Sequence, residues 1–371
     1  MDPVICLHYL HLLHSRKIPV YIFSRLLAEF ATVDALITLP KTRLQTLGFA
    51  DDQIDVLQNP SAEIDSKPQV DKALEWSVSD QHHLLCFESK HYPGILREID
   101  SAPPLLFVRG SLAALSERQF AMVGSRSASI YGKRNAYWMA QELSKAGLMI
   151  TSGLAGGIDT KAHEGALSSG GRTIAVIGTG IDRSYPAGNK QLADRIADNG
   201  ALVSEFPLGT PPYASNFPRR NRLISGMAEG TLVVEATIKS GSLITARLAM
   251  EQNRDVFALP GAIGSSGSRG CHHLIKQGAK LVEQPRDILD ELGIGDGCTE
   301  HEDSKTKDKP IPSSESSLRS AVLEAVDRQG CLFQSILQEC RLETQELSSQ
   351  LIKLEADGLI HQQGGRYFRQ G

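Results

Sequence analysis

The sequence predicts an α/β protein whose core is a doubly wound parallel sheet, with a smaller domain on each side of it. Three observations support this prediction. From about residue 104 to residue 290, short apolar runs alternate with amphipathic segments, which is typical of alternating strands and helices. Apolar residues recur near helical spacing in residues 1–80. A polar stretch, 293–315, separates a further patterned segment, residues 316–371, from the rest.

Residues 1–80 are predicted to form a small helical domain of the SAM or helix-hairpin-helix type. The apolar positions with near-helical spacing include Leu36, Leu39, Leu44 and Leu47. Pro40 and Gly48 interrupt this pattern, so the helices are expected to be short. Small helical modules often bind the DNA backbone or partner proteins, and a purely packing role fits the pattern equally well.

Residues 81–292 are predicted to form the sheet domain. Seven candidate strands begin at Leu105, Phe120, Leu148, Thr173, Ala201, Thr231 and Asp255. Several are nearly continuously apolar, as expected for a parallel sheet whose two faces are both covered by helices. Such a sheet is Rossmann-like, and its ligand binds in the crevice beyond the carboxyl ends of the strands.

Residues 293–315 are charged and contain Pro310, Pro312 and several serines, so we expect a disordered linker. Residues 316–371 then show three apolar sets at helical spacing, followed by two short strands around Gly364 and Gly365. Three helices and a hairpin predict a winged helix. This segment has six Lys/Arg against seven Asp/Glu, a net charge of -1. Because DNA binding needs cations facing phosphates, we expect it to contact proteins rather than DNA.

The overall composition gives no sign of a nucleic-acid-binding protein, since 39 Lys/Arg face 43 Asp/Glu and the net charge is -4. Any DNA site must therefore be a local basic patch. The six cysteines are scattered and form no C-x-x-C pair, which suits the reducing cytoplasm. We also expect no signal peptide and no membrane span, because no apolar run approaches the length that a span requires.

Glycine-rich turns follow several of the predicted strands. In the first, Gly124 and Ser125 let backbone amides approach a phosphate that Arg126 can hold. In the second, Gly156 and Gly157 permit a positive φ or a close ligand approach. Asp159 or Thr160 is expected to cap the helix that follows it.

A third turn, Gly178–Thr179–Gly180, follows the strand at Thr173. Neither this turn nor the second matches G-x-G-x-x-G with a later acidic residue, so no dinucleotide cofactor is expected. The phosphate loop of ATPases, G-x-x-x-x-G-K-[ST], is also missing from the sequence. We therefore predict neither a bound cofactor nor ATP hydrolysis.

The fourth turn supplies the local basic patch. It combines two short segments, whose candidate DNA-binding residues are Phe217, Arg219, Arg220, Asn221 and Arg222, then Lys239, Ser240, Gly241 and Ser242. Arginines provide phosphate contacts, and the aromatic ring provides a surface on which an unpaired base can stack. Ser242 is expected to cap the next helix, with neighbouring amides forming an anion nest. A solvated run of charges is the alternative interpretation.

Catalytic chemistry is not indicated. Glu205, Glu235, His163 and Asp182 are the strongest acid and base candidates, yet no nucleophile elbow or paired-carboxylate motif surrounds them. Cys271, His272 and His273 are adjacent but lack remote partners, so no metal site is predicted.

Seven motifs occur in the order VGSR, GLAGGIDTKAH, GTGIDRSYP, SEFP, FPRRNRLISG, VVEATIKSGSLITA and ALPG. Together they resemble the DNA-processing protein A (DprA/Smf) family over residues 85–285. The resemblance implies a non-enzymatic protein that binds single-stranded DNA, forms a homodimer, protects incoming DNA during natural transformation and loads RecA recombinase. It places the phosphate turn at Gly124, Ser125 and Arg126. It extends the DNA groove to Phe217, Arg220, Asn221, Lys239 and Ser240.

One residue departs from the family pattern: His272 occupies a position where many members carry Asn. Its protonation would make binding depend on pH.

Two alternative functions are open for this sequence. A related lysine-decarboxylase-like nucleoside monophosphate hydrolase would carry a P-G-G-x-G-T-x-x-E signature, which this sequence lacks. A scaffold protein would use only the domains that flank the sheet.

Overall fold

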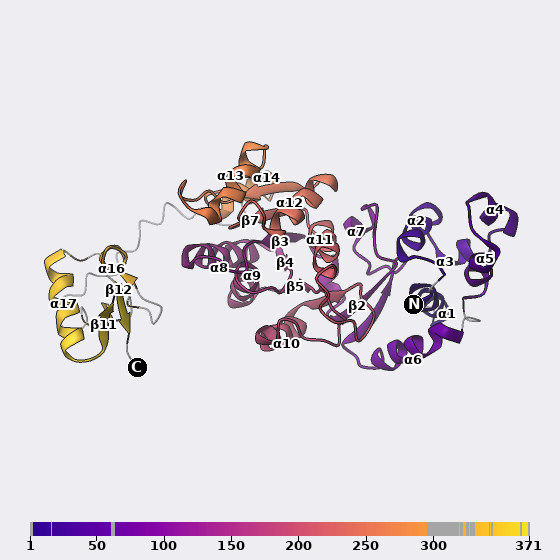
Figure 1. Cartoon of the computed structure of the whole chain (residues 1–371), viewed down its shortest axis with the longest axis horizontal. Coiled ribbons are helices and arrows are strands. Elements are labelled where there is room, and N and C mark those ends of the chain that lie inside the picture. Colours follow the sequence, from indigo (N-terminus) through magenta and orange to yellow (C-terminus); the bar gives the residue numbers. More distant parts are fainter. Residues whose placement is uncertain are drawn as a thin grey trace. The chain divides into compact units, whose positions relative to one another are not determined.

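The computed structural model describes residues 3–15, 17–60, 64–294, 319, 322–323, 326, 331–340, 342, 344–363 and 366–369. The chain forms two compact units, Met1–Gly297 and Cys298–Gly371 (Figure 1). The linker predicted at 293–315 lies outside the described residues except for its first two positions.

Short helices make up the beginning of the first unit, as predicted. They are α1 (Pro3–His14), α2 (Val20–Phe30), α3 (Val33–Ile37), α4 (Lys41–Thr46), α5 (Asp51–Gln58) and α6 (Lys67–Trp76), with a 3₁₀ turn, η2, at Ile64–Ser66. Tyr9, Phe23 and Leu36 are fully buried among them. Their core is continuous with one of the two cores of the sheet, so these helices pack onto the sheet within one compact unit.

One sheet of nine strands forms the centre of this unit as far as the structure describes it. The strands are β1 (His82–Cys86), β2 (Leu105–Gly110), β3 (Gln119–Val123), β4 (Met149–Ser152), β5 (Thr173–Val176), β6 (Ala201–Ser204), β7 (Gly230–Val233), β8 (Asp255–Ala258) and β9 (Lys280–Leu281). All seven predicted strands are present. Strands β1 and β9, which lie at the two edges of the sheet, were not predicted.

The strand order is β1-β2-β6-β5-β4-β3-β7-β8-β9. Strands β3 to β9 pair in parallel, as predicted. The prediction of a parallel sheet was wrong for β2, which runs antiparallel to β6, and β1 runs antiparallel to β2. An apolar run identifies a buried strand but carries no information on its direction, which explains this error.

Helices cover both faces of the sheet, which confirms the doubly wound arrangement (Figure 1). Strand β3 shows this directly because its side chains alternate between two cores. Phe120 and Met122 pack with α8 (Ile130–Lys145), α9 (Ile158–Ser168) and α14 (Pro285–Glu291). Ala121 and Val123 belong to the opposite core, together with residues of α10 (Lys190–Asn199), α11 (Asn216–Gly226), α12 (Gly241–Glu251) and α13 (Arg269–Lys276).

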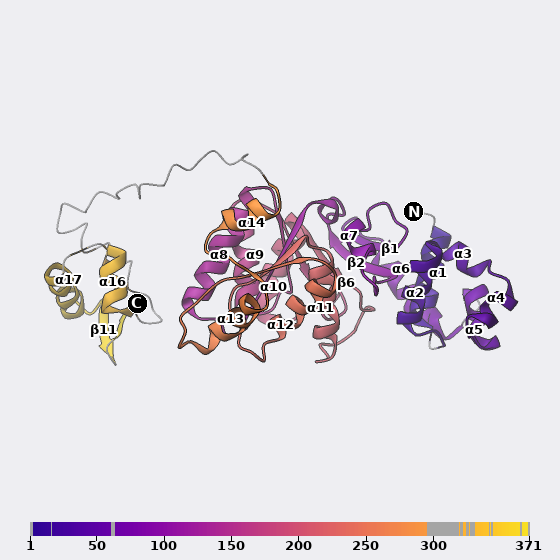
Figure 2. The same ribbon diagram turned by 90° about the horizontal axis from the view of Figure 1, so that it is seen from above.

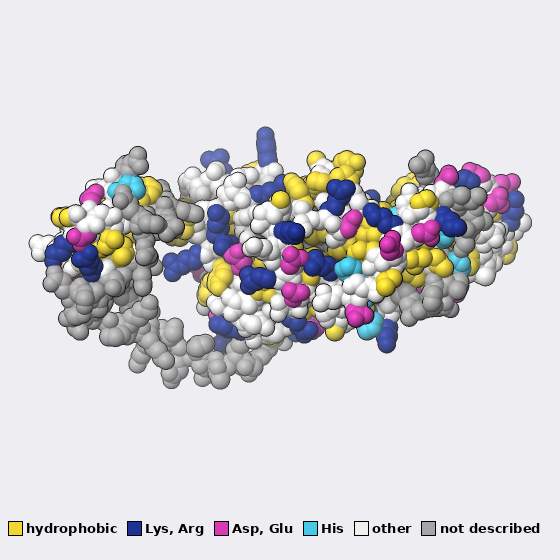
Figure 3. All heavy atoms as spheres, turned by 90° about the horizontal axis from the view of Figure 1, so that it is seen from below, with side chains coloured by type: hydrophobic (Ala, Val, Ile, Leu, Met, Phe, Trp, Pro, Cys, Tyr) yellow, Lys and Arg dark blue, Asp and Glu magenta, His cyan; other side chains and the backbone are white. Residues whose placement is uncertain are grey.

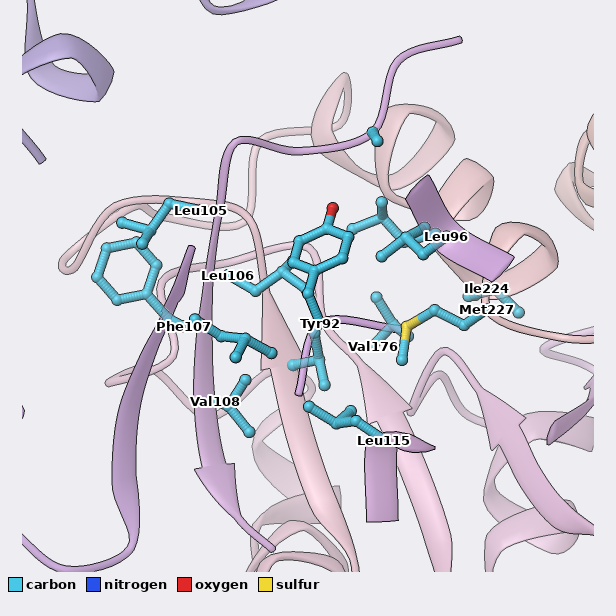
Figure 4. Close-up of a cluster of buried hydrophobic side chains, with 14 of the residues drawn as sticks. Tyr92, Leu96, Leu105, Leu106, Phe107, Val108, Leu115, Val176, Ile224 and Met227 are labelled. Carbon is cyan, nitrogen blue, oxygen red and sulfur yellow. The ribbon is translucent and has the colours of Figure 1, made fainter. Parts of the chain in front are cut away.

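The core that contains Ala121 and Val123 also fixes the connection between β1 and β2, which contains α7 (Gly94–Arg97). Figure 4 shows Tyr92 of this connection among side chains of β2, together with Ile224 of α11 and Met227, which follows that helix. The Tyr92 hydroxyl donates a hydrogen bond to the Pro103 carbonyl at 2.8 Å.

Three further 3₁₀ turns lie at η3 (Ala113–Ser116), η4 (Ala187–Asn189) and η5 (Ser266–Ser268). Helix α1 contacts both β1 and β2 (Figure 2).

The second unit contains β10 (Cys331–Leu332), α16 (Phe333–Cys340), α17 (Thr344–Ala356), β11 (Ile360–Gln363) and β12 (Arg366–Arg369). Its strands form an antiparallel sheet in the order β10-β12-β11. Ile336, Leu347, Leu351 and Leu354 are buried in its core. Two helices followed by a hairpin agree with the predicted winged helix. Most of its predicted first helix, and the turn at 364–365, lie outside the described residues.

The surface agrees with the nearly balanced composition. Figure 3 shows Lys and Arg side chains interspersed with Asp and Glu side chains on the face drawn there. A binding site for an anionic polymer must therefore be found from local geometry. Among the residues described, no helix combines the length and the apolar character needed to cross a membrane.

Candidate nucleic-acid interface

The candidate site lies where the order of the strands reverses. Chain order runs outward from β3 through β4, β5 and β6, and then returns to β7 on the other side of β3. The turns that follow β3 and β7 therefore diverge at the carboxyl edge of the sheet and leave a crevice between them. The Ser125 amide donates to the Glu235 carbonyl at 2.7 Å, which ties the two turns together.

A cavity of about 590 Å³ lies in this crevice. It is lined by most of the predicted binding residues, namely Gly124, Ser125, Arg126, Phe217, Arg220, Asn221, Ser240, Gly241 and Ser242. A smaller cavity of about 90 Å³ beside it is lined by Gly156 and shares Arg126, Phe217 and Arg220 with the larger one. Four predicted residues line neither cavity: Gly157, Arg219, Arg222 and Lys239.

Arg126 is an exposed cation that lines both cavities. Its guanidinium lies 5.4 Å from the centre of the Phe217 ring. Within the described part of the chain, its side chain makes no hydrogen bond or ion pair. A guanidinium held over an aromatic face gains a modest cation–π attraction and keeps all its N–H donors for a ligand.

The Phe217 ring has an aromatic neighbour, Tyr185, and the cationic neighbours Arg126 and Arg220. Its ring centre is 5.5 Å from that of Tyr185, which lines both cavities and was not among the predicted site residues. A Cβ on Gly178 would lie 2.9 Å from the Phe217 ring, so this glycine lets the ring lie against the backbone. The Tyr185–Pro186 pair in the sequence was the available signal for this second ring.

Gly157 shapes the site without lining it. Its φ is +81°, and a Cβ there would lie 2.3 Å from the Ser125 carbonyl oxygen. A side chain at this position would therefore push the phosphate-turn candidate aside. The predicted helix caps were wrong: α9 begins at Ile158 with Gly157 as its N-cap, and Asp159 and Thr160 lie inside the helix.

The arginine-rich segment is a helix rather than a turn, because residues 216–226 form α11. Arg220 is 4% exposed and donates from Nη1 to the Gly153 carbonyl at 2.8 Å and to the Val176 carbonyl. Gly153 directly follows β4, and Val176 is the last residue of β5. Arg220 thus joins α11 to the carboxyl edge of the sheet and forms part of the cavity wall.

Asp159 lies in the same wall and accepts hydrogen bonds from the amides of Gly153 and Ala155. Burial raises the pKa of Asp159 to about 6, although Arg220 and these amides oppose the shift. Burial also lowers the pKa of Arg220 to about 10, with Asp159 opposing that shift. At neutral pH both side chains are therefore charged and compensate each other.

The other two arginines of the run have one shared partner. Glu205, which is 3% exposed, accepts from Arg219 at 3.0 Å and from Arg222 at 2.7 Å. The Arg219 guanidinium also lies 5.3 Å from the centre of the Phe206 ring. Neither Arg219 nor Arg222 lines either cavity, so the three-arginine run supplies one cavity residue, Arg220, and that residue is buried.

The turn after β7 presents a helix N-terminus to the cavity. Ser240 is the N-cap of α12, and its hydroxyl oxygen accepts from the Ser242 amide at 3.3 Å. The predicted cap at Ser242 was therefore wrong by two residues. Lys239 is exposed beside this cap. Helix N-termini with free amides and an adjacent cation favour anions.

The candidate catalytic residues have structural partners. The Glu235 carboxylate accepts from the Ser129 hydroxyl at 2.6 Å at the start of α8, and His163 pairs with the Thr173 hydroxyl at 2.7 Å. Burial lowers the pKa of His163 to about 3. Asp182 accepts from the Gly209 amide at 2.7 Å. The structure, as far as it is described, contains no metal-ligand cluster. His272 bonds the Gly261 carbonyl and lines neither cavity.

Two family models match this chain. Residues 83–293 match the family model of DNA recombination-mediator protein A, and residues 306–366 match that of the DprA winged helix domain. The chain belongs to the DprA/Smf family. It is 50% identical to Protein Smf of Escherichia coli over 62% of each chain. It is 38% identical to DNA processing protein DprA of Bacillus subtilis, over 72% of this chain and 90% of that protein.

Two solved structures of the family are similar to this one. DNA processing protein A from Streptococcus pneumoniae matches with a TM-score of 0.59 and 39% identity, over 74% of this chain and 98% of that one. The protein from Helicobacter pylori matches with a TM-score of 0.52 and 29% identity, over 57% and 95%. The latter structure is described as giving insight into a single-stranded DNA binding mode.

Proposed function

We propose that the chain binds single-stranded DNA in the cavity between the turns after β3 and β7. One observation carries this proposal: the Arg126 guanidinium, which has no hydrogen bond or ion pair with any residue that the structure describes, lies over the Phe217 ring at a cavity lined by glycines and serines. A phosphate can accept hydrogen bonds from Arg126 and from nearby amides, and a base can stack on an aromatic ring.

The geometry favours an unpaired strand over a duplex. Stacking on Phe217 or Tyr185 requires a base whose face is exposed, and pairing within a duplex buries those faces. The cavity contacts also come from backbone amides and from a cation, and neither group reads base sequence. We therefore propose binding with little sequence preference.

The family relationship supports a wider role. We propose that the chain acts in the cytoplasm as a homodimer, protects incoming strands during natural transformation and helps to load RecA on them. The matched family is named for recombination mediation, and the Helicobacter pylori relative is described with single-stranded DNA. A direct test is whether the purified protein lets RecA polymerise on DNA already covered by a single-strand-binding protein. Unchanged RecA polymerisation would contradict the loading role.

We propose that this activity involves no catalysis. Glu205 and Glu235, the carboxylates considered as acid or base candidates, are bonded to Arg219, Arg222 and Ser129 and line neither cavity. Incubation with nucleoside monophosphates should release no free base. Release of base that Glu235→Gln abolishes would favour the hydrolase instead.

The deciding experiment is equilibrium binding of the full chain to a labelled single-stranded oligonucleotide across a salt series, with a matched duplex as competitor. We expect a clear preference for the single strand. The logarithm of the affinity should fall with the logarithm of salt concentration by about 0.7 for each phosphate neutralised. Equal affinity for the duplex, or no binding at low salt, would contradict the proposal.

A further inference from the structure

A second cavity, of about 440 Å³, lies where the N-terminal helices meet the sheet. Its lining comes from the end of α6, from β1 and β2, and from the loops after β4 and β5, and includes Trp76, Gln81, His82, Arg109, Leu154 and Arg183. None of these residues lines the cavities of the proposed DNA site. Its volume falls within the range of about 300 to 1,000 Å³ that is typical of small-molecule sites.

The two sites share a wall made of neighbouring residues. In the loop after β4, Leu154 lines the second cavity and Ala155 lines the first. In the loop after β5, Ser184 lines the second cavity and Tyr185 lines the first. Because adjacent Cα atoms are about 3.8 Å apart, the linings of the two cavities meet at these two points, and a strand long enough to continue past Tyr185 comes to the second cavity.

The second cavity has an aromatic platform. The rings of Trp76 and His82 are stacked, with centres 4.3 Å apart and planes 7° from parallel. His82 Nδ1 is bonded to the Trp76 carbonyl at 2.9 Å, and the ring centres of Trp76 and Phe107 lie 5.9 Å apart with their planes at 64°. These contacts hold both rings in place. The apolar residues Ile177, Ile181 and Leu202 complete a wall suited to the face of a base.

The charges at the rim favour a phosphate beside that base. Arg109 Nη2 lies 2.9 Å from Asp194 Oδ1, and Lys72 Nζ lies 3.8 Å from Asp182 Oδ2, so each of these two cations has an acidic partner. Arg183 is exposed, and among the described residues its side chain has no bonded partner. The rim therefore carries one uncompensated guanidinium next to the aromatic platform, which is the combination that binds single strands.

We propose that this cavity is a second nucleotide subsite, which holds an unpaired base of the same DNA strand against Trp76 and its phosphate on Arg183. The inference rests on the proposed function of the first cavity and extends it. The N-terminal helices then take part in DNA binding through the end of α6, because Trp76 is its last residue.

Tryptophan fluorescence tests this proposal because the chain contains only Trp76 and Trp138. Trp138→Phe, at a position 40% exposed on α8, leaves Trp76 as the sole reporter. Oligothymidylates of about 4 to about 16 nucleotides span the site sizes of known single-strand-binding folds. We expect the shortest to bind without quenching Trp76, and the longer ones to bind more tightly and quench it.

A matched pair of arginine variants tests the phosphate contact. Arg183→Ala should make the salt dependence of long-oligonucleotide binding shallower by about 0.7 and leave short oligonucleotides unaffected. Arg195→Ala removes an exposed cation of α10 that lies outside the cavity lining, and should change neither. Equal slopes for the two variants with the long oligonucleotide would contradict the assignment of Arg183.

The outcomes separate the two proposals. Absence of binding at every length contradicts the proposed function itself. Binding at all lengths without quenching of Trp76 contradicts only the second subsite. Quenching by thymidine monophosphate but by no oligonucleotide would also overturn the proposal, because the cavity would then take a free nucleotide rather than a continuing strand.

Discussion

The turn after β3 and the arginine-rich helix α11 were both expected to contact phosphates, and the structure separates them. The turn has one arginine, Arg126, which is exposed and bonded to no protein group that the structure describes. The helix has three, and all of them have protein partners: two carbonyls for Arg220 and Glu205 for Arg219 and Arg222. A cation's availability to a ligand therefore depends on its partners, which the local density of charge in a sequence does not show.

The largest expected effect comes from Arg220→Ala. Loss of the Arg220 side chain leaves the Gly153 and Val176 carbonyls without this donor and leaves Asp159 without its compensating charge. Breaking a buried ionic contact of this kind costs about 3 to 5 kcal/mol of unfolding free energy. Urea unfolding followed by circular dichroism measures it. The matched variant Arg126→Ala should stay within about 0.5 kcal/mol of the wild type. Similar losses of unfolding free energy in both variants would contradict the distinction between a structural Arg220 and an Arg126 that is available to a ligand.

The second prediction concerns pH. Burial raises the pKa of Asp159 to about 6, above its ordinary value of 3.8, so the folded state holds this proton more tightly than the unfolded state does. The corresponding stability is present below about pH 4 and is lost as the pH rises through about 6. The loss is at most about 3 kcal/mol, at about 1.36 kcal/mol per pKa unit.

The Asp159→Asn variant has no titratable group at this position. Comparison with it therefore separates the contribution of Asp159 to the pH dependence of stability from that of other carboxyl groups. The unfolding free energy of the wild type, measured relative to this variant, should fall between about pH 4 and about pH 6 and then level off. A difference that is constant across this range, or that rises, would contradict the raised pKa.

Much of the fold could be predicted from the sequence because its strands are buried on both faces and are therefore apolar. The two edge strands escaped prediction for physical reasons. Strand β1 begins with His82 and His83, and β9 has only two residues. Strand direction was also beyond reach at β2, since apolar patterning is the same for parallel and antiparallel strands.

The candidate site was predictable where backbone geometry dictates the residue type. Gly157 has a positive φ and faces the Ser125 carbonyl, so the sequence had to place glycine there. The arginine run was harder to interpret. Glu205 directly follows β6 and lies 17 residues before Arg222 of α11, so its ion pairs arise only on folding. Sequence spacing cannot show such a partner.

The third prediction concerns the ring beneath Arg126. Phe217→Ala should lower the affinity for a single-stranded oligonucleotide by about 1 to 3 kcal/mol, the usual contribution of one base stacked on an aromatic side chain. Its salt dependence should hardly change, because stacking is not ionic. Phe217→Tyr keeps the ring and should retain most of the affinity. A large change in salt dependence would instead mean that Phe217 mainly positions Arg126.

The smallest expected effect is also the most direct test of the comparison. Arg126→Ala should make the salt dependence of binding shallower by about 0.7, because one phosphate contact is lost. Arg219→Ala removes a cation of the same charge that is paired with Glu205, and Arg222 remains to compensate that carboxylate. We therefore expect its slope to match the wild type. Since Arg219 is half exposed, its ion pair should contribute no more than about 1 kcal/mol to stability. If Arg219→Ala changed the slope as much as Arg126→Ala, the ion pair with Glu205 would have to open when DNA binds, and α11 would then supply phosphate contacts despite its partners.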